Sequence, residues 1–373
     1  MKIGFGGLGV IALVCACGGK SASSIDDTVA TAQPADPCAG IVLPAVTPAD
    51  LKTFDVAGSD THCVSAGTDL LGNVFVSVYT RYVVDQSVVT SAGLTLQSFH
   101  PAAFLRSGFA TFDDYWHPVA HYQSYSPEGA VLNSLDIPNA LLTVTQNPKG
   151  GSVVASGKCD DGGASSTIQL FYLDDANTLV RTAKVTGQGC METGGSLKIV
   201  VDTAGLTLIV HPNNYQSIFG VPARRFAARW LDASGSPMTE WFDAGPLIDV
   251  GFFVQPLIGG GAAVSSDNNS WTFFPSGKSQ AEPLPAILAL RKAPIILNRE
   301  GNLPIVLGGN AYAVASGAKG TVNAPTGEVC GQLPPLGDPS DYFYYLYFGR
   351  DGSLITLTGA NRCTVSYYPR LLK

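Results

Sequence analysis

Apolar and polar residues alternate along most of the chain in short runs. Residues 73–80 (NVFVSVYT) alternate β-branched and aromatic residues, a pattern typical of a strand, whose successive side chains lie on opposite faces. Residues 285–292 (PAILALRK) come nearest to a helical period, but they are few and flanked by proline. The pattern therefore predicts an all-β chain. Further strands are expected at 141–145, 152–155, 167–173, 197–201, 206–210, 295–297 and 304–307.

Two patterns repeat along these strands. The first is an aromatic strand, a turn that ends in Gly or Asn, and a second strand, as in 122–132, 171–180, 230–241 and 347–355. The second is a glycine-rich start followed by small and β-branched residues, as in 150–157, 259–265 and 308–317. Several copies recur at about 45–60 residues, close to the length of a propeller blade.

The repeats predict a six- or seven-bladed β-propeller, with tandem β-sandwich domains as the alternative. In the propeller, the glycine-rich strand is expected to be the innermost strand of a blade, where small residues fit near the axis. The aromatic hairpin is expected to form the outer pair of strands.

The N-terminus has the layout of an export signal. Lys2 is followed by an apolar run at 3–16, which falls short of the roughly 20 residues that cross a bilayer as a helix. The sequence Val14-Cys15-Ala16-Cys17 resembles the lipobox of bacterial lipoproteins. This resemblance implies cleavage after Ala16 and a lipid on Cys17. An ordinary signal peptide cut elsewhere and a buried strand of a cytosolic protein remain as alternatives.

Three segments follow from this interpretation. Residues 1–16 are the lipoprotein signal peptide, 17–37 a flexible tether rich in Ala, Ser, Asp, Thr and Pro, and 38–373 the propeller-like domain. Gly18, rather than an aspartate, follows the lipidated cysteine. In enteric bacteria, an aspartate at this position is the signal that retains a lipoprotein in the inner membrane, so its absence favours the outer membrane. The resemblance therefore implies an exported protein anchored by lipid in the outer membrane, facing either the cell surface or the periplasm.

Composition supports export and limits the partners. The 373 residues carry a net charge of −7, and the loss of Lys2 with the signal makes it −8. An acidic chain without basic clusters argues against nucleic acid as a partner. The basic residues that lie closest together, Arg224, Arg225 and Arg229, are expected to be solvated or paired.

Besides Cys17, which carries the lipid, six cysteines remain in the mature chain, and an even number in an exported protein predicts disulfides. We expect three bonds between cysteines close in sequence, with free buried thiols as the alternative. The expected pairs are Cys38–Cys63, Cys159–Cys190 and Cys330–Cys363.

One cluster has the residue types of a ligand surface. Tyr115 and Trp116 offer aromatic faces for stacking, and His117 and His121 offer polar edges. Zinc ligation by the two histidines is a weaker alternative, because Pro118 between them disfavours the helix that would bring them to one face. Core packing of a hairpin is the ordinary explanation.

No catalytic motif and no cofactor site stands out. The Gly-x-Ser-x-Gly elbow, the phosphate-binding loop and the His-Glu-x-x-His motif do not occur in the sequence. Asp160 and Asp161 are a weak calcium candidate, since the complete calcium-loop pattern is missing.

The sequence thus predicts a lipid-anchored binding or adhesion module rather than an enzyme. Its expected partners are the membrane, through the lipid, and a glycan or an envelope or surface protein. A periplasmic scaffold for envelope assembly and an enzyme acting on polysaccharide or peptide are the alternatives.

Overall fold

Strands and the turns between them make up the described part of the computed structural model. The structure describes residues 36–39, 52–56, 61–80, 83–90, 95–97, 101–113, 119–138, 141–147, 149–159, 165–188, 197–213, 225–246, 253–256, 260–265, 271–283, 305–307, 311–316, 319–324, 328–332, 345–348, 353–358 and 363–368. No helix occurs in these ranges, and therefore none that is long and apolar enough to span a membrane.

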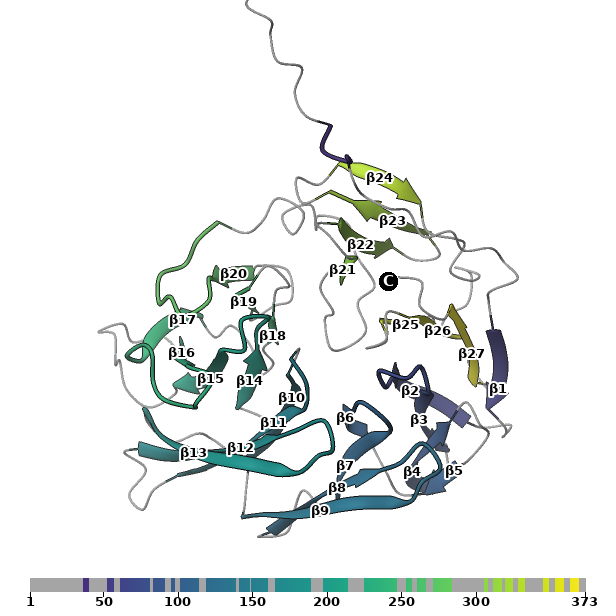
Figure 1. Cartoon of the computed structure of the whole chain (residues 1–373), viewed down its shortest axis with the longest axis horizontal. Helices are drawn as coiled ribbons and strands as arrows, with labels where there is room; N and C mark the ends of the chain where they lie inside the picture. Colours follow the sequence, from purple (N-terminus) through teal and green to yellow (C-terminus); the bar gives the residue numbers. More distant parts are fainter. Residues whose placement is uncertain are drawn as a thin grey trace, which may run out of the picture. The chain divides into compact units, whose positions relative to one another are not determined.

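Residues 37–373 form one compact unit. The described strands form seven antiparallel sheets, which we number as blades (Figure 1). Blade 1 contains β2 (Thr61–Thr68), β3 (Val74–Thr80), β4 (Val83–Thr90) and β5 (Thr95–Gln97). Blade 2 contains β6 (Pro101–Phe104), β7 (Phe109–Asp113), β8 (Val119–Tyr125) and β9 (Val131–Pro138). Blade 3 contains β10 (Leu141–Gln146), β11 (Ser152–Cys159), β12 (Ser165–Leu173) and β13 (Leu179–Gln188).

The later blades repeat this order. Blade 4 contains β14 (Lys198–Val201), β15 (Thr207–Asn213), β16 (Arg225–Leu231) and β17 (Phe242–Pro246). Blade 5 contains β18 (Phe253–Pro256), β19 (Ala262–Ser265) and β20 (Trp271–Phe274). Blade 6 contains β21 (Ile305–Leu307), β22 (Ala311–Ser316), β23 (Lys319–Asn323) and β24 (Val329–Gln332). Blade 7 contains β25 (Tyr345–Phe348), β26 (Leu354–Thr358) and β27 (Cys363–Tyr368).

The N-terminal strand β1 (Lys52–Val56) completes blade 7. It pairs with β27 in an antiparallel ladder that runs from Lys52 opposite Tyr367 to Val56 opposite Cys363. The Thr364 hydroxyl donates to Asp55 Oδ1 at 2.6 Å in the same ladder. The two ends of the domain thus share one sheet, which closes a β-propeller with seven blades and confirms the predicted fold class.

Apolar cores fill the space between successive blades. The first strands of neighbouring blades contact each other, as β6 contacts β10 and β10 contacts β14, so the first strand is innermost and the last outermost. Between blades 4 and 5 lies a cluster around Trp230, which is fully buried. Comparable clusters join blade 7 to 1, blade 1 to 2, blade 2 to 3 and blade 3 to 4.

The order of the glycine-rich strands corrects one expectation. These segments form β11, β19 and β22, which are the second strands of blades 3, 5 and 6 rather than the innermost ones. Small residues fit there because the second strand packs on both faces, and residues 152–157 of β11 are all buried. The preceding Gly150 and Gly151 belong to a turn, where they have φ angles of 117° and 75°.

The aromatic hairpins were predicted correctly for three blades. Residues 122–132, 171–180 and 230–241 belong to the outer halves of blades 2, 3 and 4. The copy at 347–355 instead joins β25 to β26, the inner strands of blade 7, because β1 from the N-terminus takes the outermost place there.

The two ends of each blade differ. In an antiparallel meander, the connections from strand one to two and from strand three to four leave at one end, which we call the turn end. The remaining connections leave at the opposite end, which we call the loop end.

One turn recurs at the turn end. Its first residue is Asp, Asn or Ser, whose backbone carbonyl accepts a hydrogen bond from the fourth residue. The first side chain accepts from the backbone of the third or fifth residue, or of both. The fourth residue has a positive φ angle and is Gly, or Asn177 with a φ angle of 61°. The turn occurs at 69–73, 126–130, 147–151, 174–178, 202–206 and 232–236.

These turns also join neighbouring blades. Asp69, which is fully buried, accepts a hydrogen bond at 2.7 Å from the backbone of Gly108 in blade 2. Asp202 in blade 4 accepts one at 3.0 Å from the backbone of Gly261 in blade 5. Lys149 Nζ in blade 3 donates to the carbonyl oxygen of Ala204 in blade 4 at 2.6 Å. The turn end is therefore a continuous hydrogen-bonded layer across much of the described ring.

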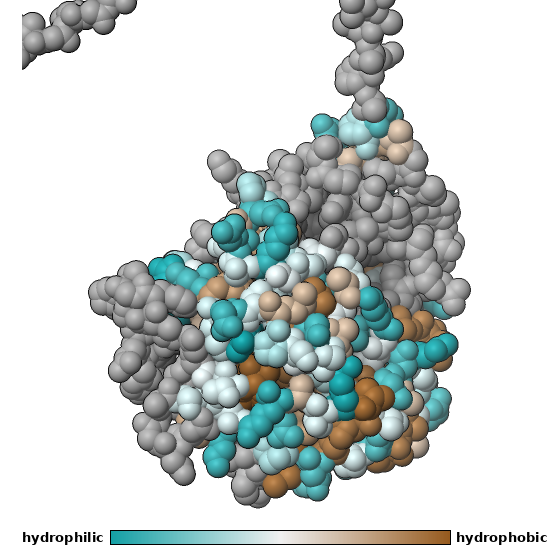
Figure 2. All heavy atoms as spheres, turned by 60° about the vertical axis from the view of Figure 1, so that its left-hand side comes forward, coloured by the Kyte–Doolittle hydropathy of each residue, from teal (hydrophilic) through white to brown (hydrophobic). Residues whose placement is uncertain are grey.

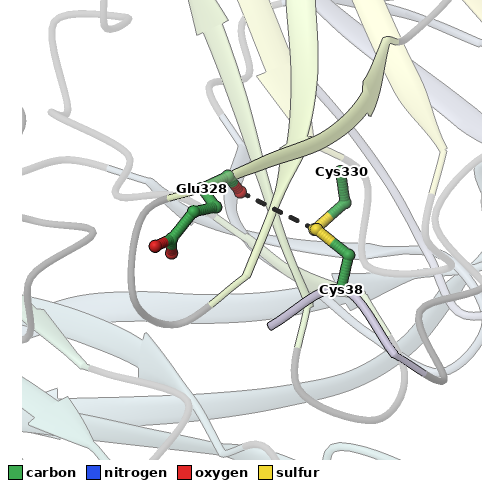
Figure 3. The surroundings of a disulfide bond; sticks show 3 residues. All are labelled: Cys38, Glu328 and Cys330. Carbon is green, nitrogen blue, oxygen red and sulfur yellow. Dashed lines mark hydrogen bonds between the residues drawn. A yellow bond between two sulfur atoms is a disulfide. The ribbon is translucent and has the colours of Figure 1, made fainter. Parts of the chain in front are cut away.

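The disulfides differ from the expected pairs. Cys38 is bonded to Cys330 in the outermost strand of blade 6, with a Cα–Cα distance of 5.4 Å, and Cys330 Sγ lies 3.6 Å from the Glu328 carbonyl oxygen (Figure 3). The expected pairs Cys38–Cys63 and Cys330–Cys363 are therefore wrong. Closure of the propeller brings the N-terminal segment to the last blades, which pairing by closeness in sequence overlooks.

The third expected pair stays a prediction. Cys159 is disulfide-bonded, and Cys190, its expected partner, lies outside the described residues. Cys63 lies in β2 and Cys363 in β27, and the structure describes the backbone of both.

Candidate binding surface at the loop end

The ligand-surface residues expected from the sequence are only partly described. Tyr115, Trp116 and His117 lie outside the described residues, in the segment that joins β7 to β8. His121 lies in β8, two residues after this strand begins at the loop end. The calcium candidates Asp160 and Asp161 lie outside the described residues, as does the lipidation candidate Cys17.

His121 pairs with an acid of the neighbouring strand. The two residues are directly opposite each other in the ladder of β8 and β9. His121 Nδ1 lies 2.6 Å from Asp136 Oδ1, and the two side chains are 45% and 70% exposed. This pair orients the imidazole from the surface of blade 2, next to the segment that carries Trp116.

A second charged pair lies at the loop end of blade 4. Arg225 opens β16, and Asp243 lies in the adjacent β17. Arg225 Nε and Nη2 both lie 2.5 Å from Asp243 Oδ2, and about a quarter of each side chain is exposed. The other oxygen of Asp243 accepts a hydrogen bond at 3.0 Å from the backbone of Gly245. The arginine is thus paired, as the sequence analysis expects.

Arg229 is held by the backbone. Its Nε donates to the carbonyl oxygen of Thr239 at 2.8 Å, and its guanidinium lies 5.8 Å from the centre of the Trp241 ring. Glu240 Oε2 lies at 3.8 Å, but the glutamate is 96% exposed, so solvent screens that pair. Arg224 lies outside the described residues.

A buried histidine lies beside these arginines. His211 in β15 is fully buried, and its ring meets the Trp241 ring edge-on at 4.9 Å between centroids. Its Nδ1 lies 3.0 Å from the carbonyl oxygen of Pro212. A carbonyl only accepts, so Nδ1 carries the proton and Nε2 presents a lone pair without a hydrogen-bond partner. Burial lowers the pKa of His211, against a smaller opposite effect of the bond to Pro212.

The sequence pattern does not predict this cluster of His211 and Trp241 beside blade 3. Alternating residues of β15 and β16 face blade 3, which places His211 in a row with Ala227 and Asp243 across the sheet. The Trp241 indole donates to the carbonyl oxygen of Thr186 in blade 3 at 3.0 Å. The alternation of residues 207–213 indicates a strand and shows which of its residues share a face. The pairing of β16 with β17, however, shifts by a bulge that cannot be predicted from the sequence.

The described side chains limit the chemistry that the loop end can provide. Among the described residues, no group of three or more His, Cys, Asp or Glu side chains is arranged to hold a metal ion. The described loop end instead offers an exposed His–Asp pair and an Arg–Asp pair of which about a quarter is exposed, beside the buried contact of His211 with Trp241. Such charged pairs serve recognition by hydrogen bonding.

Comparisons with known proteins give a likeness in fold alone. No protein-family model matches the sequence, and no curated protein matches it. A streptogramin B lyase structure has 10% identity and a TM-score of 0.43 over 85% of this chain and 96% of that chain. A catalytically inactive virginiamycin B lyase from Staphylococcus aureus with quinupristin has 13% identity and a TM-score of 0.41, over 85% of this chain and 98% of that chain. The β-propeller domain of the Trilobed protease from Pyrococcus furiosus has 9% identity and a TM-score of 0.49, over 83% of this chain and 95% of that chain.

Proposed function

We propose that the protein is an exported binding module, anchored to the cell envelope through a lipid on Cys17, which recognises a carbohydrate at the loop end of its propeller. The N-terminal signal supports export and anchoring. The contrast between the two ends of the blades supports binding at the loop end, and it is the observation on which the proposal depends.

The connections at the loop end vary in length and composition. They run from two residues, as at 81–82, to the long segments 214–224 and 333–344 between described strands. Segments of this kind carry binding functions on many scaffolds, because they change without disturbing the strands that hold them. At the turn end, one hydrogen-bonded turn is used again and again.

Carbohydrate is the ligand class that the residue types favour. Loop-end segments contain Tyr115 and Trp116, and the segment before β25 contains Tyr342, Phe343 and Tyr344. Aromatic faces stack on sugar rings, and carboxylate, imidazole and guanidinium groups bind hydroxyls. His121, Asp136, Arg225 and Asp243 supply such groups on the described strands of the same end.

The test uses the mature chain and a panel of labelled envelope glycans, including peptidoglycan fragments and polysaccharide. Binding by the wild type should be lost or strongly reduced in Trp116→Ala. Leu71→Ala, which removes an exposed apolar side chain at the turn end, is the matched control and should bind as the wild type does. Absence of glycan binding, or equal loss in both variants, would reject carbohydrate recognition at the loop end.

The orientation of the anchored protein is measured separately. Protease digestion on intact cells would place the domain at the cell surface. Protection until the outer membrane is permeabilised would place it in the periplasm, in line with a role among envelope components there.

A further inference from the structure

Two cysteines lie where the ring closes. Cys63 is the third residue of β2 in blade 1, and Cys363 is the first residue of β27 in blade 7. Both strands begin at the loop end, because the connections that lead into them, from β1 and from β26, leave at that end. Figure 1 shows these two blades next to each other. The two cysteines therefore lie at the same end of neighbouring blades.

An apolar core joins these two blades. It contains Val56 of β1, Val78 of β3 and Val365 of β27, which are 5%, 3% and 0% exposed. The outer surface differs from this core, because hydrophilic and apolar residues lie side by side on its described part (Figure 2). Cα atoms of β2 lie within 8 Å of Cα atoms of β27. The two strands thus pass near each other, as a disulfide between them requires, because its Cα atoms are about 4–7 Å apart.

The strand ladders place both cysteines on the faces that form this core. Cys63 is directly opposite Val78 in the ladder of β2 and β3, and residues directly opposite each other occupy the same face of a sheet. Cys363 is directly opposite Val56 in the ladder of β1 and β27. Val78 and Val56 both belong to the core between the blades. Each cysteine therefore takes a register position on the face that its blade turns toward the other blade.

A bulge in blade 1 determines the position of Cys63. Ala66 is directly opposite Val76, and simple alternation would put Cys63, three residues before Ala66, on the other face of the sheet. The register of β2 and β3 shifts between Cys63 and Ser65, so that Cys63 is opposite Val78, which shares its face with Val76. Alternation in the sequence alone would therefore separate this cysteine from the core.

The other four cysteines of the domain are assigned to other blades. Cys38 is bonded to Cys330 in blade 6. Cys159 is disulfide-bonded and ends β11 in blade 3. Its expected partner, Cys190, follows the last residue of β13 in the same blade by two residues. This assignment leaves the cysteines of blades 1 and 7 for each other.

We propose that Cys63 and Cys363 form a disulfide bond, which joins blade 1 to blade 7 at the loop end. Formation of the bond removes one hydrogen from each thiol. The two electrons and two protons pass to the disulfide of an oxidised envelope protein, which becomes a dithiol. The proposal rests on the export that is part of the proposed function, because disulfides form and persist in oxidising compartments.

The bond makes closure of the ring covalent. In sequence, β1 lies between Cys38 and Cys63. Cys38 is bonded to blade 6, and the proposed bond attaches Cys63 to blade 7. Both ends of the stretch that contains β1 are then fixed to the last two blades. Displacement of β1 from β27 is limited by these two bonds even when the hydrogen bonds of the ladder open.

Peptide mapping tests the bond directly, because trypsin places each of the six cysteines in a separate peptide. The full mature chain is recovered from the envelope, unfolded in mildly acidic denaturant with N-ethylmaleimide, and digested without reductant. We expect a species in which residues 53–81 and 363–370 are linked, and which reductant separates into these two peptides. Modification of both peptides by maleimide before reduction would overturn the proposal, as would a link from either of them to another cysteine.

Single substitutions test the same pair by the thiol that they release. In Cys63→Ser, the thiol of Cys363 should become reactive toward maleimide in the unfolded chain, and Cys363→Ser should release Cys63 in the same way. Cys190→Ser is the matched control and should leave residues 53–81 linked to residues 363–370. A thiol of Cys363 that is equally reactive in the wild type and in Cys63→Ser would overturn the proposal.

Failure of the bond and failure of export are told apart by the other disulfide. If Cys38 and Cys330 are linked while Cys63 and Cys363 both react with maleimide, the chain has reached an oxidising compartment and only the further bond is refuted. If all six cysteines react, the bond and the export in the proposed function are both refuted. Glycan binding at the loop end is tested independently by Trp116→Ala.

Discussion

The turn end and the loop end of this propeller are built on different principles. At the turn end, a single type of turn recurs, its first side chain accepts backbone hydrogen bonds, and several turns bond to the next blade. At the loop end, the described contacts differ from blade to blade: Arg225 pairs with Asp243, and the Trp241 indole donates to the carbonyl oxygen of Thr186. The comparison teaches that one repeated turn and its hydrogen bonds hold the turn end, whereas contacts particular to each blade hold the described loop end.

The disulfide should give the largest effect on stability. Cys38 and Cys330 are 292 residues apart in sequence, so the bond restricts a very large loop in the unfolded chain and should contribute about 5 kcal/mol. We expect Cys38→Ser/Cys330→Ser to lower the free energy of unfolding by this amount in denaturant titration. Fluorescence and circular dichroism report the transition. A stability equal to that of the wild type would show that the β1–β27 ladder closes the ring unaided.

Two glycines allow a matched comparison of the ends. Both have positive φ angles, 90° at Gly108 and 124° at Gly245. A Cβ atom at Gly108 would lie 1.9 Å from the carbonyl oxygen of Tyr125, whereas one at Gly245 would meet nothing within 4 Å. Backbone strain alone should cost about 1 kcal/mol in Gly245→Ala, and the added clash should bring Gly108→Ala to about 3 kcal/mol. Thermal and denaturant unfolding of the two variants measures this difference, and equal losses would refute it.

The smallest expected effect is a loss of stability at acidic pH. His211 is buried in its neutral form, which lowers its pKa in the folded protein below the value of about 6.5 expected in the unfolded chain. Between the two values the unfolded chain binds a proton that the folded protein does not. The contribution of His211 to stability is therefore complete above about pH 6.5 and declines as the pH falls toward its folded pKa.

Unfolding titrations at a series of pH values check this contribution. His211→Gln removes the titrating group and should flatten the stability profile below pH 6.5 relative to the wild type. Asp243 and Arg225 flank the histidine across the sheet, so Asp243→Asn serves as a control that changes the nearby charge and leaves the imidazole. An unchanged profile in His211→Gln would assign the acid sensitivity to other groups.

The fold could be predicted because its signals are local. Alternation in segments such as 167–173 and the turn residues at Gly129, Asn177 and Gly235 mark strands and hairpins directly in the sequence. The place of each strand within a blade was harder to predict. Small residues fit both an innermost strand and a second strand buried on both faces, and only the pairing of β10 with β11 decides between them.

The parts that sequence reasoning missed depend on contacts between distant segments. The bond from Cys38 to Cys330 follows from ring closure, which no spacing of cysteines reveals. The contact of His211 with Trp241 requires the register of three strands and a bulge. Of the expected ligand-surface residues, only His121 lies in the described part of the chain, and its partner Asp136 is identified by the strand ladder alone.

Because β1 and β27 share the sheet of blade 7, this sheet cannot be completed until both strands have been synthesised. β1 is made early in synthesis, whereas Thr364 of β27, the strand that pairs with β1 in the described ladder, follows Asp55 by 309 residues. The edge of β1 therefore cannot form this ladder until β27 has been synthesised. Pairing between strands so distant in sequence slows folding. Until it occurs, the unpaired edge of β1 is open to aggregation, against which chaperones protect.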